Sequence, residues 1–132
     1  MITPQYITGL IDGEGSFTVY VRNPKSLRVV KRRVKVEPRF YVKLVETDKK
    51  VLYELKDFFK CGNVYIQKDK RKNHKTCYRY EVSNRKDLVS IIMPFFSKNV
   101  LQFPSKKKDF LIFCKMMERI NQGEHLTEKG LK

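Results

Sequence analysis

Alternation of apolar and polar residues predicts four β-strands in this chain. The predicted strands cover residues 16–22, 31–45, 64–67 and 77–82. In residues 31–45 the apolar side chains occupy one parity while lysine and arginine recur on the other, which is the period-two pattern of a strand with one buried face. Pro38 interrupts that pattern, and we expect a bulge or kink there.

Apolar residues at helical spacing predict four helices around these strands. They cover residues 4–13, 48–61, 88–96 and 105–120. Thr3 is expected to cap the first helix and Asp48 the second. The order α-β-β-α-β-β-α-α predicts an α+β fold in which helices cover one face of an antiparallel sheet. At 132 residues the chain fits a single domain over 1–132, with a polar tail over 121–132.

The charge balance favours a polyanionic partner. The chain has 29 Lys and Arg against 14 Asp and Glu, a net charge of +15 at pH 7. Repulsion among these positive charges is unfavourable unless a polyanion binds. As that polyanion, nucleic acid is favoured over an anionic membrane. No stretch reaches the ~20 apolar residues of a membrane span, and no secretory or lipidation signal is visible. We therefore expect no membrane partner and an intracellular location.

The three cysteines, Cys61, Cys77 and Cys114, form no CxxC pair, and their odd number argues against a disulfide framework. Reduced thiols are expected. Cys61, His74 and Cys77 could supply zinc ligands, but their spacing matches no common zinc pattern and a fourth ligand is missing.

The polar face of the sheet and its connecting segments are expected to bind DNA, because lysine, arginine and tyrosine recur there. The predicted DNA-binding residues are Ser16, Thr18, Tyr20, Arg22, Arg28, Lys31, Arg33, Lys35, Arg39, Tyr41, Lys43, Tyr65, Gln67, Lys70, Arg71 and Arg79. Arginines on strands are placed to read base edges, whereas the basic segment 68–75 suits phosphates.

The first helix has features that stability does not explain. Gly9 and Gly13 lie four residues apart on one face, and a mid-helix glycine costs up to ~1 kcal/mol against alanine. Their benefit is close approach of a second helix. Asp12 and Glu14 lie at the end of the helix where the dipole disfavours carboxylates. Two such helices would bring two Glu14 carboxylates together and favour Mg²⁺, which suggests phosphodiester cleavage.

The same segment resembles a known motif. Residues 7–15, Ile-Thr-Gly-Leu-Ile-Asp-Gly-Glu-Gly, resemble the LAGLIDADG nonapeptide, with Glu14 in place of the second aspartate and Gly13 in place of the alanine. Segments 40–62, 106–110 and 124–127 are similar to later parts of the same family, so the resemblance spans nearly the whole chain. The chain is identified as a member of the LAGLIDADG homing endonuclease family.

That resemblance implies an αββαββα core and an enzyme that cleaves both strands of DNA at a long pseudo-palindromic site. Glu14 would ligate Mg²⁺, or another divalent ion such as Mn²⁺, with help from the Gly13 carbonyl. One motif implies a homodimer, with an interface formed by Thr8, Gly9, Asp12 and Gly13. The family's active-site lysine matches Lys106, with its neighbour Lys107 left open. Such proteins act in the cytoplasm or in an organelle.

One position departs from the family. Several relatives carry a glutamine that positions solvent where this chain has Leu44, and the polar neighbour here is Glu46. This departure predicts a different water network or weak activity.

Three other functions remain open at this point. The first is an RNA maturase that assists intron splicing through the same basic surface. The second is a non-catalytic DNA-binding protein of the same fold, which the presence of Glu14 disfavours. The third is a general RNA-binding module that would stack bases on Tyr20, Tyr41 and Tyr65.

Overall fold

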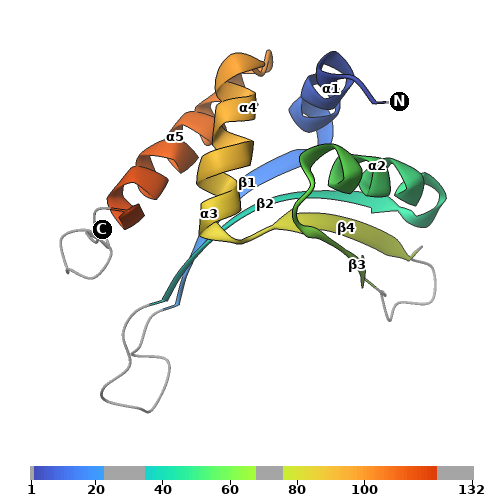
Figure 1. Ribbon diagram of the computed structural model, residues 1–132, viewed down its shortest axis with the longest axis horizontal. Helices are drawn as coiled ribbons and strands as arrows, with labels where there is room; N and C mark the ends of the chain where they lie inside the picture. Colours follow the sequence, from blue (N-terminus) through green and yellow to red (C-terminus); the bar gives the residue numbers. More distant parts are fainter. Residues whose placement is uncertain (1, 23–34, 68–75, 122–132) are drawn as a thin grey trace, which may run out of the picture.

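The computed structural model describes residues 2–22, 35–67 and 76–121, and helices cover one face of a four-stranded sheet (Figure 1). The elements are α1 (Pro4–Glu14), β1 (Gly15–Arg22), β2 (Lys35–Val45), η2 (Glu46–Asp48), α2 (Lys49–Phe59), β3 (Asn63–Gln67), β4 (Cys77–Val82), α3 (Arg85–Asp87), η3 (Leu88–Ile92), α4 (Met93–Lys98) and α5 (Pro104–Asn121). The predicted α+β fold and its element order are confirmed.

The strand order in the sheet is β1-β2-β4-β3, and all neighbours are antiparallel. The register places Phe40 opposite both Phe17 and Val82, and these three side chains are buried. Because side chains alternate between the two faces of a strand, Tyr41 and its register partners Ser16 and Glu81 lie on the other face. We call this second face, which no helix of the described residues covers, the open face (Figure 1).

The predicted bulge at Pro38 is wrong. The β1–β2 register runs without interruption from Gly15 opposite Val42 to Arg22 opposite Lys35. Pro38 lies where β2 is paired with β1 only, because pairing with β4 begins at Phe40. The Val36 carbonyl, two residues earlier, accepts a hydrogen bond from the Arg85 side chain instead of from a strand. The amide position of Pro38 therefore faces this unpaired edge, where a missing N–H costs no ladder hydrogen bond.

Both ends of α2 differ in detail from the sequence prediction. Asp48 precedes the helix, but its side chain makes no capping hydrogen bond, because residues 46–48 already form the turn η2. At the other end Lys60 adopts the left-handed conformation with φ of 57° and closes α2 by its N–H to the Lys56 carbonyl. Gly62 follows with φ of 81°, and a Cβ there would lie 2.7 Å from the Glu81 carbonyl oxygen. Only glycine fits this conformation and this approach.

The helix predicted over residues 88–96 is longer and irregular. Helical structure runs from Arg85 to Lys98, capped by the Asn84 side chain, and its middle, η3, is a π-helical stretch. Pro94 follows this stretch, in the first turn of α4. A proline cannot donate to the preceding turn, and a local change of helix pitch accommodates it.

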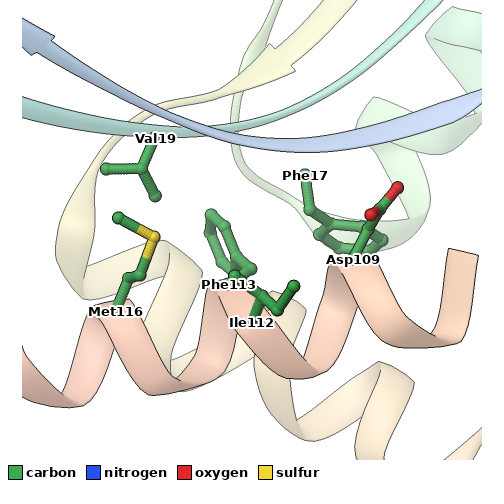
Figure 2. A pocket seen from close by; sticks show the side chains of 6 residues that line it. All are labelled: Phe17, Val19, Asp109, Ile112, Phe113 and Met116. Carbon is green, nitrogen blue, oxygen red and sulfur yellow. The ribbon is translucent and has the colours of Figure 1, made fainter.

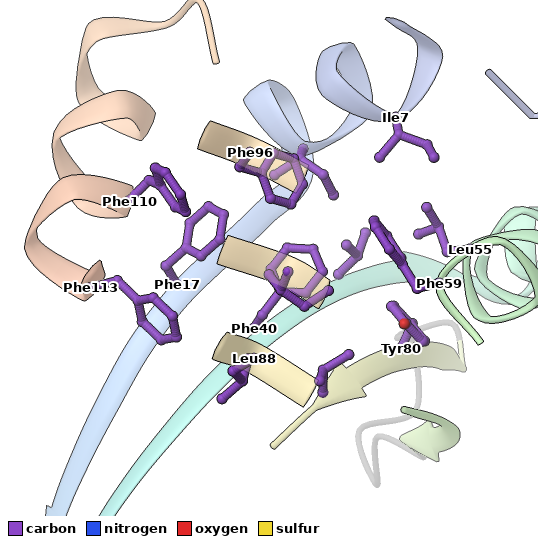
Figure 3. Close-up of a cluster of buried hydrophobic side chains, with 14 of the residues drawn as sticks. Ile7, Phe17, Phe40, Leu55, Phe59, Tyr80, Leu88, Phe96, Phe110 and Phe113 are labelled. Atoms are coloured by element: carbon purple, nitrogen blue, oxygen red, sulfur yellow. The ribbon is translucent and has the colours of Figure 1, made fainter. Parts of the chain in front are cut away.

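Aromatic side chains fill the core between the sheet and the helices (Figure 3). Phe17 contacts Phe40, Phe96 and Phe110, with ring centroids 5.1, 5.5 and 5.1 Å apart. These contacts tie β1 and β2 to α4 and α5. Among the described residues, no helix is long and apolar enough to cross a membrane.

Candidate active site and nucleic-acid interface

The end of α1 carries the first candidate catalytic residue. Thr3 caps the start of the helix by accepting from the Tyr6 amide at 3.1 Å, as predicted. The helix ends at Glu14, where Gly15 closes it with an N–H to the Ile11 carbonyl. A Cβ at Gly15 would lie 2.4 Å from the Ile11 side chain, so glycine lets β1 begin immediately after the helix. The Glu14 side chain is left exposed at this junction.

Asp12 has a different place from the one that the sequence suggested. Its side chain is 5% exposed, and its carboxylate accepts hydrogen bonds from the backbone amides of Gln102 at 3.0 Å and Phe103 at 3.1 Å. These amides precede α5, where no helical carbonyl is available to them. The expectation that the Asp12 side chain faces a partner helix is therefore corrected: it joins α1 to the start of α5 within the chain.

The same connection brings a lysine to the end of α1. The Lys106 ammonium, in the first turn of α5, donates a hydrogen bond to the Gly15 carbonyl oxygen. Lys106 is half-buried, whereas its neighbour Lys107 is exposed. Of the two lysines that the sequence left open, Lys106 is thus the one held next to the residue that follows Glu14. A lysine there stabilises the helix C-terminus as well, because the dipole is negative at that end.

One face of α1 is open. Gly9 and Gly13 are exposed, and a Cβ added at either would meet no atom within 4 Å outside its immediate chain neighbourhood. Thr8 is half-buried and its hydroxyl donates to the Pro4 carbonyl at 2.9 Å. Tyr6, one helical turn before Gly9, is 53% exposed. The two glycines therefore have no packing partner in the described part of the chain.

The open face gathers most of the described side chains that the sequence assigned to DNA. The register places on this face Ser16, Thr18 and Tyr20 of β1, Arg39, Tyr41 and Lys43 of β2, Tyr65 and Gln67 of β3, and Arg79 of β4. The alternation that predicted this shared face is confirmed for the four strands. Leu44, by contrast, has the parity of the core and packs against it.

The described open face is less basic than the sequence suggested. Arg39 pairs with Glu37 at 2.9 Å and lies 3.7 Å from Glu81, and Arg79 pairs with Glu81 at 2.7 Å. The glutamates occur in sequence two residues from each arginine, Glu37-x-Arg39 and Arg79-x-Glu81, which is the spacing of same-face neighbours on a strand. This spacing in the sequence indicates that the two glutamates can pair with the arginines, although no function was assigned to either acid from the sequence.

Aromatic rings flank both arginines. The Arg79 guanidinium carbon lies 3.6 Å from the centroid of the Tyr41 ring, and that of Arg39 lies 4.9 Å from the Tyr20 ring. Desolvation raises the pKa of Tyr20, but hydrogen bonds with the Thr18 and Arg79 side chains and the positive charge of Arg79 outweigh it, so the pKa lies below the usual tyrosine value.

The remaining predicted DNA-binding residues lie outside what the structure describes. These are Arg28, Lys31, Arg33, Lys70 and Arg71, together with the side chains of Arg22 and Lys35. His74 of the zinc hypothesis also lies outside it. The three cysteines form no disulfide in the described part of the chain and are half-buried, and the described residues contain no cluster of three or more potential metal ligands. Burial raises the pKa of the Cys61 and Cys114 thiols, which keeps them protonated at neutral pH.

A small apolar pocket lies on the helical side of the sheet, between β1 and α5 (Figure 2). Its volume is about 130 Å³, and it is lined by Phe17, Val19, Asp109, Ile112, Phe113 and Met116. Asp109 is its sole charged lining residue, and neither Glu14 nor Lys106 lines it. The pocket is therefore separate from the candidate catalytic residues.

Comparison with known proteins decides the family. Residues 7–117 match the family model described as LAGLIDADG endonuclease. The chain belongs to the LAGLIDADG endonuclease family. Over 99% of its length it is 34% identical to a probable intron-encoded endonuclease of Neurospora crassa, and over 91% it is 28% identical to DNA endonuclease I-CeuI of Chlamydomonas moewusii. The chain spans 27% and 53% of the length of these two proteins.

Solved structures show the same fold. The LAGLIDADG chain superposes on the homing endonuclease I-TnaI with a TM-score of 0.79 and 34% identity, covering 98% of this chain and 81% of that one. It superposes on I-SmaMI bound to cleaved DNA with a TM-score of 0.82 and 35% identity, covering 99% of this chain and 41% of that one. A further I-SmaMI structure, bound to uncleaved DNA with calcium ions, gives a TM-score of 0.82 at 33% identity, covering 99% of this chain and 42% of that one. The chain thus corresponds to less than half of I-SmaMI.

Proposed function

We propose that this chain is one unit of a homing endonuclease that cleaves both strands of DNA at a long, specific site. The observation that carries the proposal is the junction of α1 and β1, where the exposed Glu14 carboxylate lies one residue from the carbonyl that Lys106 binds, beside the open glycine face. Relatives named as DNA endonucleases and the I-SmaMI complex with cleaved DNA support it. As several relatives are named intron-encoded, we place its gene in an intron and its action inside the cell, in the cytoplasm or an organelle.

The proposed cofactor is Mg²⁺ or another divalent ion such as Mn²⁺. The donor set fits a site shared between two units: Glu14 offers a hard, exposed carboxylate, Gly13 is exposed beside it, and Asp12 is already engaged by two amides. Mg²⁺ in proteins commonly takes one or two carboxylates and completes its shell with water and substrate phosphates. When bound, such an ion neutralises charge on the attacking and leaving oxygens of a phosphodiester.

Lys106 is proposed as the active-site lysine. Its ammonium is fixed at the Gly15 carbonyl, so it presents positive charge at the junction before DNA arrives. A cation placed in advance stabilises the extra negative charge on the scissile phosphate without reorganising in the transition state. Lys107 is exposed and its backbone amide donates to the Phe103 carbonyl, which is an ordinary helical role.

The proposed assembly is a homodimer through α1. The exposed apolar side chains Tyr6, Val100 and Phe103 are 53%, 43% and 55% exposed. Tyr6 shares a helix face with Gly9, and the Phe103 amide is bound to Asp12, so an apolar rim adjoins the glycine face. A second α1 helix packed on Gly9 and Gly13 would cover this surface and bring two Glu14 carboxylates to one dyad. Because the chain covers 41% of I-SmaMI, the second unit could equally belong to one longer polypeptide.

The decisive experiment first selects bound sites from a pool of random duplexes, then measures cleavage of supercoiled plasmids that carry the selected site, with Mg²⁺ and with EDTA. We expect linear product with Mg²⁺ only. Glu14→Gln should abolish cleavage while DNA affinity persists, because the change removes a ligand charge without changing shape. Glu118→Gln on α5 removes the same charge elsewhere and should cleave like the wild type. A wild-type protein that binds DNA but never cleaves it would favour the non-catalytic or maturase functions instead.

A further inference from the structure

Four charged side chains form a compact group on the open face, which we call the charge cluster: Glu37 and Arg39 of β2, and Arg79 and Glu81 of β4. Glu81 lies between the arginines, with its Oε1 2.7 Å from Arg79 Nη2 and 3.7 Å from Arg39 Nη1. Arg39 Nη2 in turn donates to Glu37 Oε2 at 2.9 Å. Each arginine of the cluster therefore has a carboxylate partner within its own sheet.

The Arg79 guanidinium is held below the surface. Its side chain is 15% exposed, it stacks over the Tyr41 ring, and the Glu81 side chain beside it is 13% exposed. Its Nε is sealed from solvent and makes no hydrogen bond in good geometry among the described residues, whereas its Nη2, equally sealed, has the Glu81 carboxylate as its partner. A buried donor without an acceptor is costly, so Nε is a donor that a bound ligand would satisfy. Arginine uses paired N–H groups of this kind to read guanine in the major groove.

The charge cluster also leaves the middle of the sheet nearly neutral. Its two glutamates offset two of the three described basic side chains on the open face, the third being Lys43. In the sequence, segments 23–34 and 68–75 contain five Lys or Arg residues each and one acid between them. Most of the net charge of +15 thus belongs to the two segments that connect paired strands in the sequence.

We propose that Glu81, supported by Glu37, is a specificity-determining residue that restricts Arg39 and Arg79 to target DNA. On random DNA the guanidinium exchanges one anionic partner, the carboxylate, for another, the phosphate. This exchange gains little binding free energy, and it leaves the Glu81 carboxylate next to the negatively charged DNA backbone. On a G·C base pair, arginine bonds the guanine edge while the released carboxylate accepts from the cytosine amino group. The arginine then binds one base of the pair and the carboxylate binds the other, so both keep a hydrogen-bonding partner. This inference rests on the proposed function, because it takes the open face as the DNA-binding surface.

The test compares Glu81→Gln with Glu118→Gln, which removes the same charge from α5. Binding to a labelled duplex of mixed sequence is measured by fluorescence anisotropy across a range of salt. Glu81→Gln should bind this duplex more tightly than Glu118→Gln does, and its slope of log K against log salt should be steeper by about one per unit, because one guanidinium is freed for a phosphate. Selection from random duplexes should show a weakened G·C preference at one position of each half-site.

The outcomes separate the two proposals. A wild-type chain without salt-dependent DNA binding would defeat the proposed function itself. If the wild type binds but Glu81→Gln matches Glu118→Gln in affinity, salt slope and sequence preference, the role of Glu81 is refuted and the proposed function stands. If Glu81→Gln unfolds because Arg79 loses its ion pair, the same measurements are made on Glu37→Gln instead. Its side chain is 29% exposed, its loss frees Arg39 from the closer of its two carboxylates, and the same direction of change is required.

Discussion

Asp12 and Glu14 lie two residues apart in the family motif, and the structure predicts opposite consequences for their loss. The Asp12 carboxylate is buried and accepts from two backbone amides, whereas Glu14 is exposed. Asp12→Asn removes the charge from both hydrogen bonds and turns an NH₂ group toward the Gln102 amide. We expect Asp12→Asn to destabilise the fold and Glu14→Gln to leave it unchanged.

The size of the effect follows from the contacts. Hydrogen bonds to a charged acceptor contribute about 1 kcal/mol more than neutral ones, and a buried donor facing a donor costs about 1 kcal/mol or more. With two amides on the carboxylate, Asp12→Asn should lose about 3 kcal/mol. For a domain of this size that corresponds to a fall of about 10 °C in Tm and of about 1–2 M in the urea midpoint.

The assay is urea unfolding followed by circular dichroism, at one protomer concentration because the proposed pairing of units would contribute to stability. Glu14→Gln is the matched control, since it makes the same chemical change two residues away. Midpoints of Asp12→Asn and Glu14→Gln that coincide with the wild type would refute the assignment of Asp12 to folding. Loss of stability in Glu14→Gln alone would reverse the two roles.

Three further predictions concern packing and pH. Gly62→Ala should lose more than about 2 kcal/mol in urea unfolding, because φ is 81° and the Cβ would lie 2.7 Å from the Glu81 carbonyl; an unchanged midpoint would contradict this. Gly9→Val should dissociate the proposed dimer in sedimentation velocity while the single unit keeps its circular dichroism spectrum, since the site is open in the single chain; a variant that remains dimeric would disprove the glycine interface. Tyr80→Phe should cost about 1 kcal/mol at pH 7, where the hydroxyl donates to the Cys61 carbonyl at 2.8 Å. Burial raises the pKa of Tyr80, so above pH 10 this tyrosine ionises only in the unfolded wild type. The free energy of unfolding of the wild type relative to Tyr80→Phe should therefore fall by about 1.4 kcal/mol per pH unit. A difference between the two proteins that stays constant up to pH 11 would argue against this burial effect.

The strands could be predicted from sequence because their information is local. Period-two alternation fixes which side chains share a face, and the open-face positions of Thr18, Arg39 and Arg79 follow from parity alone. Capping by Thr3 is equally local, since donor and acceptor are three residues apart. Glu14 could be named as the candidate acid because the nonapeptide itself carries the resemblance.

What the sequence could not decide depends on contacts between distant segments. Asp12 meets the amides of Gln102 and Phe103 across some ninety positions, and a carboxylate at the end of a helix looks alike whether it binds a metal or an amide. That Lys106, and not Lys107, contacts the Gly15 carbonyl follows from how α5 is turned against β1. Pro38 is tolerated without a bulge only because β4 stops short of it.

The charge of the open face depends partly on local spacing and partly on tertiary structure. The close pairs Glu37–Arg39 and Arg79–Glu81 each lie within one strand, two residues apart, whereas the 3.7 Å contact between Arg39 and Glu81 requires β4 to lie beside β2. The physical reason is the distance along the chain over which each kind of interaction acts. Backbone dihedral preferences and side-chain parity act over a few residues and can be read along the chain. Hydrogen bonds and ion pairs between elements depend on positions that only the packed core fixes.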